Sequence, residues 1–126
     1  LYSGKDKREH TWKVFVFCYR EAEDGSLQWH EGLTKLVARD FQRARGRTDD
    51  WQIVDSEALH AYFLTALKEG KRIKEVPPDL AGKSKKYGVD GVLLGSLTAP
   101  RNDKIRFDVA WLSLLSEKER RLRLVP

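Results

Sequence analysis

The sequence predicts an α/β domain built on a mixed β-sheet, and three observations lead to this prediction. Two short, nearly continuous apolar runs, residues 12–19 and 89–98, have the composition of strands that are buried on both faces. Between these runs lie amphipathic segments with helical periodicity. After them, apolar and polar residues alternate from residue 105 to residue 112. We therefore expect a three-layer-like mixed sheet of about five strands with helices packed on it, in the order β-α-β-α-α-β-β-β.

The first half of the chain alternates between strand and helix. Residues 12–19 predict a central strand, because aromatic and β-branched side chains fill almost every position. Residues 28–45 predict an amphipathic helix that Gly46 closes. Its apolar arc contains Leu33, Leu36, Val37, Phe41 and Ala44. Asp40 projects into this arc, so its carboxylate is expected to find a donor or to reach the rim. Residues 51–54 then predict a short strand.

The middle of the chain carries clear signals for the start and the end of a helix. Asp55 and Ser56 supply an N-cap, and the helix is expected to run to about Glu69, where Gly70 stops it. A third, shorter helix is expected over residues 78–88, with a proline in its first turn.

The last part predicts an antiparallel meander. In residues 89–98, Gly91 and Gly95 indicate a close approach to the backbone or a bulge. Residues 105–112 have the clearest period-two alternation in the chain, with Ile, Phe, Val and Trp at every second position.

A final strand is expected over residues 119–125. It would place Leu122 and Leu124 on one face and Arg121 and Arg123 on the other. This strand would be the edge of the sheet, and its arginines would discourage edge-to-edge pairing.

Composition suits a single packed domain. The chain has 126 residues, of which 40% are hydrophobic and 34% charged, which is too apolar for a disordered segment. We expect residues 1–11 to be a lead-in or linker and residues 12–126 to be one domain. No run of about 18 apolar residues occurs, so no transmembrane segment is expected. The absence of methionine is typical of a chain cut from a longer precursor.

Basic residues provide the candidate binding surface. The formal charge is +5, which permits attraction to an anionic partner but selects none. Lys35, Arg39 and Arg43 recur at a spacing of four and would form a ridge on the polar side of the first helix. Together with Arg121 and Arg123 on the expected edge strand, they are the candidate partner-binding residues.

Residues that could carry chemistry are scattered. The sequence lacks a nucleophile elbow, a phosphate-binding loop and a dinucleotide fingerprint. His10, His30 and His60 have no metal-ligand spacing. Cys18 lies inside the first strand, where a buried and unreactive thiol is expected. We therefore expect no catalytic, cofactor-binding or metal-binding residues and no enzymatic activity.

Several sequence blocks resemble a known module. They are Glu31–Thr34 (EGLT), Trp51–Leu59 (WQIVDSEAL), Tyr87–Thr98 (YGVDGVLLGSLT) and the hairpin that begins IRFDVAW at Ile105. Over about residues 12–124, this pattern resembles the TolB amino-terminal-domain-like module, which is shared with curli-secretion and penicillin-binding-protein-activator lipoproteins. The resemblance implies a cell-envelope module that binds other proteins or cell-wall components, without catalytic residues.

These observations leave three function hypotheses. The first is a non-enzymatic interaction domain of a bacterial cell-envelope or secreted protein, periplasmic or associated with the outer membrane, that binds a protein partner or a cell-wall polymer. The second is a small-molecule-sensing accessory domain of a signalling protein, with a pocket near Tyr19–Arg20 and Asp55–Ser56 at the carboxyl ends of strands. The third is a basic nucleic-acid-binding module. The alternative location is the cytoplasm.

Overall fold

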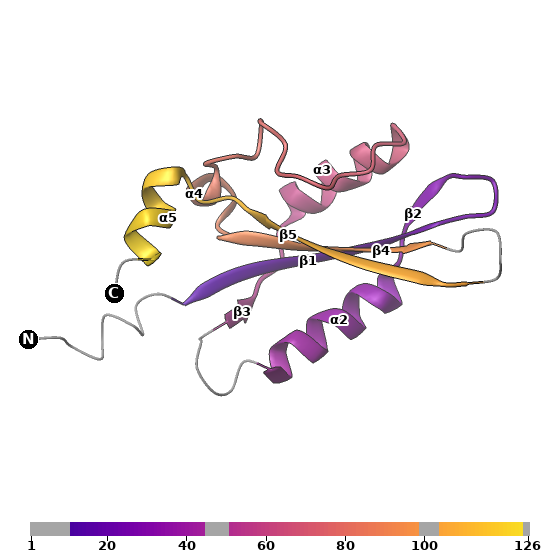
Figure 1. Ribbon diagram of the computed structural model, residues 1–126, viewed down its shortest axis with the longest axis horizontal. Coiled ribbons are helices and arrows are strands. Elements are labelled where there is room, and N and C mark those ends of the chain that lie inside the picture. The colour runs from indigo at the N-terminus through magenta and orange to yellow at the C-terminus, as the bar shows by residue number, and fades with distance from the viewer. Residues whose placement is uncertain (1–10, 45–50, 99–103, 125–126) are drawn as a thin grey trace, which may run out of the picture.

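The computed structural model describes residues 11–44, 51–98 and 104–124, which form one mixed sheet with helices on both sides (Figure 1). The predicted α/β class is confirmed. The elements are β1 (Trp12–Glu21), β2 (Leu27–Trp29), α2 (Glu31–Ala44), β3 (Trp51–Ile53), α3 (Glu57–Lys68), α4 (Ser84–Tyr87), β4 (Gly91–Thr98), β5 (Arg106–Ser113) and α5 (Glu117–Leu124). The expected helix end at Gly46 and nearly all of the expected lead-in lie outside the described residues.

Strand β1 is the centre of the sheet. It pairs in parallel with β4, in a register that runs from Val14 opposite Gly91 to Arg20 opposite Leu97. The other edge of β1 is shared by β3, which is parallel to its first residues, and β2, which is antiparallel to its last residues. Strand β5 is antiparallel to β4 and lies at the end of the sheet. The two apolar runs are therefore neighbouring inner strands, which agrees with the prediction that both are buried on their two faces.

Each face of β1 is packed against a different helix. Phe15 and Phe17 on one face pack with Phe63 and Leu67 of α3 in the larger core cluster. Val14, Val16 and Cys18 on the other face pack against α2 and β3. Figure 1 shows α2 and α3 on opposite sides of the sheet, which gives three layers.

The first predicted helix starts later than expected. Residues 27–29 are strand β2, and α2 begins at Glu31. The reason is a tight turn, in which Ala22 N–H donates to the Ser26 carbonyl and Gly25 adopts a φ of 86°. This turn folds the chain back onto β1 before the helix can begin. Leu36, expected in the apolar arc, is exposed on α2, and Asp40 reaches the surface.

The expected last strand is a helix, so this prediction is wrong. Residues Glu117–Leu124 form α5, and Arg121 and Arg123 lie on that helix rather than on an edge strand. Ser116 and Glu119 form a reciprocal capping box. The Glu119 N–H donates to Ser116 Oγ at 3.1 Å, and the Ser116 N–H donates to Glu119 Oε1 at 3.0 Å. The alternation of Leu and Arg is compatible with either structure, and the cap decides for the helix.

The other two predicted helices agree with the observed helix bounds to different degrees. Helix α3 has the expected cap, because Ser56 Oγ accepts the N–H of Leu59 at 3.2 Å, and Gly70 follows it with a φ of 73°. The third predicted helix is shorter than expected. Residues 78–82 form successive turns, and only Ser84–Tyr87 are α-helical, ending at the left-handed Gly88.

Candidate functional site

The most unusual surface of the described structure is an apolar stripe on β5. Phe107, Val109 and Trp111 are 44%, 49% and 41% exposed, and Ile105, directly before the strand, is 74% exposed. They occupy alternate positions, so the three strand residues share one face of the sheet. We call Phe107, Val109 and Trp111 the open face. An alternation of this kind normally marks the side of a strand that packs inward.

The open face exists because no described helix covers that part of the sheet. It lies on the same side as Val14, Val16 and Cys18, which α2 covers. Helix α2 packs over β1 and β3, through Leu33, Val37 and Phe41 among others, and does not extend over β5. Apolar side chains at the far end of the sheet are thus left in contact with solvent.

A row of aromatic rings connects the open face to the core. Trp51 of β3, Trp12 of β1 and Trp111 of β5 follow one another across the sheet, with ring centroids 6.3 Å apart at both steps. Phe41 of α2 continues the row with an edge-on contact to Trp51 at 4.8 Å. Such contacts favour tilted or edge-to-face geometry, so they hold the position of Trp111 although its ring is partly exposed.

Two glycines of β4 make this arrangement possible. A Cβ atom on Gly91 would overlap the ring of Trp111, and one on Gly95 would lie 2.8 Å from Cys18 Sγ and 3.1 Å from Phe107 Cε1. The predicted close approach at both glycines is therefore confirmed. The aromatic rings of β5 lie close to the backbone of β4 at these positions, which orients Trp111 and Phe107 on the open face.

The predicted basic residues whose side chains are described lie on two helices, α2 and α5. Lys35, Arg39 and Arg43 are exposed on α2, as expected. However, Lys35 is paired with Glu31 at 2.9 Å, and Arg39 Nε lies 4.0 Å from Asp40. Arg121 is exposed on α5 and paired with Glu117 at 2.6 Å. These neighbouring carboxylates offset much of the positive charge.

A cleft of about 530 Å³ lies between the N-terminal ends of α2 and α3. Its aromatic lining includes Trp29 and His60, whose rings meet edge-on at a centroid distance of 4.6 Å. Its polar lining includes Asp55 and Ser56, as the pocket hypothesis expects. Tyr19 and Arg20, the other expected residues, do not line it.

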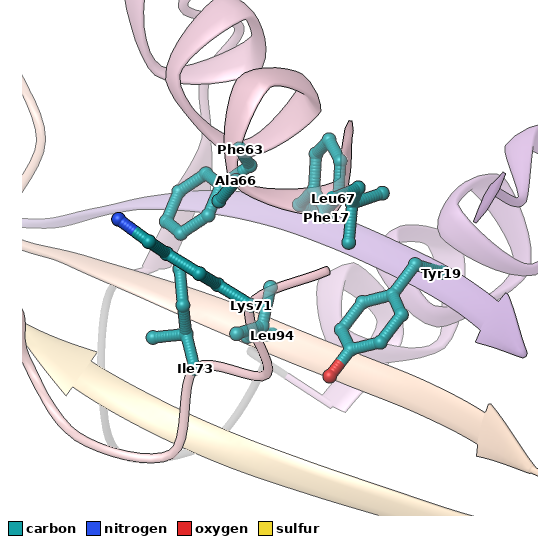
Figure 2. Close-up of a pocket in the computed structure, with 8 residues that line it drawn as sticks. All are labelled: Phe17, Tyr19, Phe63, Ala66, Leu67, Lys71, Ile73 and Leu94. Carbon is teal, nitrogen blue, oxygen red and sulfur yellow. The ribbon is translucent and has the colours of Figure 1, made fainter. Parts of the chain in front are cut away.

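Tyr19 instead borders a depression that is filled by side chains (Figure 2). Phe17, Phe63 and Leu94 close it from the sheet and α3, and it leaves no room for a water molecule. Burial is the main cause that raises the pKa of Tyr19 above its usual value. This position belongs to the core and does not form a ligand site.

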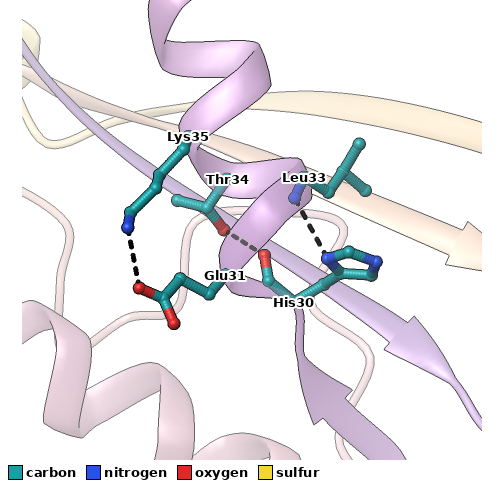
Figure 3. A network of polar contacts seen from close by, with 5 residues as sticks. All are labelled: His30, Glu31, Leu33, Thr34 and Lys35. Carbon is teal, nitrogen blue, oxygen red and sulfur yellow. Dashed lines mark hydrogen bonds and ion pairs between the residues drawn. The ribbon is translucent and has the colours of Figure 1, made fainter.

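A network of polar contacts lies at the start of α2 (Figure 3). One further hydrogen bond joins it to β1. His30 Nδ1 accepts the N–H of Leu33 at 3.0 Å, so this histidine caps the helix. Thr34 Oγ1 donates to the His30 carbonyl at 2.8 Å and accepts the N–H of Cys18 at 2.9 Å. His30 and Thr34 thus have structural roles in joining α2 to the central strand.

The groups that could be reactive have unreactive surroundings. Cys18 is a free and buried thiol, and burial raises its pKa. Within residues 11–44, 51–98 and 104–124, no three His, Cys, Asp or Glu side chains gather closely enough to hold a metal ion. In the same part of the chain, no helix has the length and apolar character needed to cross a bilayer.

The sequence indicates that β5 has an apolar face, but it does not indicate that this face is uncovered. The alternation at residues 105–112 identifies an apolar face, while its exposure depends on where α2 lies. No family model, curated protein or solved structure matches this chain.

Proposed function

We propose that this chain is a non-enzymatic protein-interaction domain whose binding surface is the open face, Phe107, Val109 and Trp111. One observation carries the proposal: three large apolar side chains share one face of β5, and each is more than two-fifths exposed. Contiguous apolar patches on small domains mark sites where another protein docks. Aromatic anchors of this kind are also enriched among the residues that dominate binding energy.

The fixed position of the side chains supports the same function. Trp111 is held by the edge-on contact with Trp12 and by its position across Gly91. A side chain that is ordered before binding loses less conformational entropy when a partner covers it. The resemblance to envelope modules of the TolB type leads us to propose the periplasm or the outer membrane surface as the location.

Variants at two surfaces test this proposal. The immobilised chain is exposed to proteins extracted from the envelope of the producing cell, captured proteins are identified, and binding is repeated with purified components. Val109→Glu places a charge at the centre of the open face and is expected to weaken binding at least about tenfold. A matched control reverses Lys35, Arg39 and Arg43 on α2 and is expected to leave binding unchanged.

The opposite pattern would overturn the proposal. Binding that survives Val109→Glu but is lost on reversal of the α2 ridge would assign the surface to the basic residues, and an anionic cell-wall polymer would then become the favoured partner. Thermal unfolding of each variant shows whether the fold is retained. Both sets of side chains are exposed, so small changes in stability are expected.

The cleft between α2 and α3 favours small-molecule sensing as a second candidate function. Trp29 and His60 offer an aromatic wall, and Asp55 and Glu57 offer carboxylates. Glu31 also lines the cleft, where it is paired with Lys35. This combination suits a small ligand with an apolar body and a cationic nitrogen. A thermal-shift screen of amines tests it, with Trp29→Ala as the comparison. A flat response in the wild-type chain would exclude this candidate.

A further inference from the structure

Strand β5 has one edge that no described strand occupies. Its inner edge pairs with β4 along its whole length, from Arg106 opposite Thr98 to Ser113 opposite Gly91. Its outer edge has no neighbour in the sheet order of the described residues. An exposed edge with apolar side chains is a template for pairing with another strand.

The backbone groups on that outer edge can be assigned. Leu114, directly after β5, donates its N–H to the Asp90 carbonyl at 2.9 Å, which continues the β4–β5 register by one residue. Backbone N–H and C=O groups alternate in direction along a strand. The even-numbered residues of β5 therefore direct these groups toward β4. Phe107, Val109 and Trp111 therefore direct their N–H and C=O groups outward.

The charges of β5 are self-complementary in one antiparallel register. Arg106 and Asp108 lie on the face opposite to the open face and are both exposed. If Phe107 is placed opposite Phe107 of a second copy, Arg106 of each copy faces Asp108 of the other. These two pairs fall at non-hydrogen-bonded positions, where opposed Cα atoms are only about 4.5 Å apart.

Neighbouring registers lack this match. A two-fold axis at Asp108 would place two aspartates opposite each other, which is repulsive. An axis at Val109 would place Arg106 opposite Leu112 and Asp108 opposite Ala110, so neither charge would gain a partner. The Phe107-centred register also brings Ile105, which is 74% exposed, opposite Val109 of the second copy.

We infer that the chain forms a symmetric dimer through antiparallel pairing of β5 with β5 of a second copy, with the two-fold axis at Phe107. This inference rests on the proposed protein-interaction function and adds a second copy of this chain as a partner at the outer edge of β5. A two-fold axis makes every contact occur twice, as the two Arg106–Asp108 pairs require. The end of β5 that would pair lies away from α5 (Figure 1).

A charge-swap experiment tests both the dimer and its register. Arg106→Asp makes both positions acidic, and Asp108→Arg makes both basic. Each variant alone should dimerise at least about tenfold more weakly than the wild-type chain, because two attractive pairs become repulsive. An equimolar mixture of the two variants should recover dimerisation, since acidic and basic edges then face each other. Sedimentation velocity over a concentration series measures all three samples.

The two variants control for each other. Within one chain, Arg106 Nε lies 2.9 Å from Asp108 Oδ2, and each variant removes this exposed ion pair. Only the mixture restores complementary charges, so its recovery cannot arise from folding of either variant. In the wild-type dimer, hydrogen exchange at the Phe107 and Val109 amides should slow with increasing concentration.

Two results would overturn the inference. A wild-type chain that stays monomeric at every concentration would exclude the dimer. A wild-type dimer whose assembly is insensitive to both charge variants, with a mixture that behaves like either alone, would exclude the Phe107-centred register. Failure of the dimer is distinguishable from failure of the proposed function. If the chain is a monomer and Val109→Glu still weakens its binding to a purified partner, the open face remains its binding surface.

Discussion

The ring of Trp111 lies across the backbone of Gly91, in the space that any larger residue at that position would fill. Because Gly91 has no side chain, Trp111 of β5 reaches past β4 and contacts Trp12 of β1. The exposed edge of the sheet and its central strand are thus joined by one aromatic contact. The same contact orients the side chain that we propose as a binding anchor.

Adding a methyl group at Gly91 should therefore destabilise the domain. Gly91→Ala is expected to lower the free energy of unfolding by about 1–3 kcal/mol, because the new Cβ displaces the Trp111 ring. Denaturant unfolding measures this change. In a Trp111→Leu background the same substitution should cost less, since the obstructing ring is absent.

Gly32→Ala is the matched control for this prediction. Gly32 lies in the first turn of α2, and the nearest atom to its added Cβ would be His30 Cε1 at 3.5 Å, an ordinary contact. Alanine there should leave stability unchanged or raise it slightly. Equal effects of the two substitutions would argue against the packing of Trp111 on Gly91.

Thr34→Val should lower the free energy of unfolding, because it removes a hydrogen bond between α2 and the central strand. The substitution keeps the shape of the side chain but removes the oxygen that accepts the Cys18 N–H. A strand N–H without an acceptor is expected to cost about 1–3 kcal/mol of unfolding free energy. Thr65→Val, at an exposed position on α3, should change stability by less than about 0.5 kcal/mol. A Thr34→Val variant as stable as this control would show that the bond contributes little.

The capping box of α5 should make stability depend on acid pH. Donation from the Ser116 N–H is the main cause that lowers the pKa of Glu119 below its ordinary value of 4.5. The ionised carboxylate is thus favoured in the folded chain. Its stabilising contribution is complete above pH 4.5 and is lost as the pH falls through the lowered pKa.

Two substitutions isolate this contribution. Glu119→Gln removes the titrating group, so the stability difference from the wild-type chain should shrink as the solution becomes acidic. Ser116→Ala removes the hydroxyl half of the box and should cost about 1 kcal/mol at neutral pH. Chemical unfolding at a series of pH values measures both. Parallel pH profiles for wild-type and Glu119→Gln chains would contradict the assignment.

Tyr62 should give stability a dependence on alkaline pH. Its hydroxyl donates to Asp79 Oδ1 at 2.7 Å, which joins α3 to the segment before α4. Burial, followed by this hydrogen bond to Asp79, raises the pKa of Tyr62 well above its ordinary value of 10.0. The folded state therefore holds the phenolic proton more tightly, and this contribution declines as the pH rises above about 10.

Tyr62→Phe provides the comparison for the alkaline prediction. It removes the proton and the hydrogen bond together but keeps the ring that packs edge-on against Phe63. The wild-type chain should lose its stability advantage over this variant as the pH increases. An advantage that is constant with pH, measured by thermal unfolding, would show that the phenol titrates alike in both states.

Several elements could be predicted from local sequence because their signals are local. The apolar composition of residues 12–19 and 89–98, the cap at Ser56 and the stop at Gly70 act within a few residues. The capping box at Ser116–Glu119 is equally local and favours α5, whereas the alternation of leucine and arginine favours a strand over the same residues. Strand β2 cannot be predicted from its periodicity, because three residues are too few for a period to show.

The candidate site also has one part that the local sequence determines and one part that it does not. By itself, the sequence determined that Phe107, Val109 and Trp111 share one face and that Gly91 and Gly95 admit a close neighbour, because strand geometry fixes both. Only the tertiary structure decided that this face meets solvent. Helix α2 packs over β1 and β3, and the distance from there to β5 depends on strand order, which no local pattern encodes.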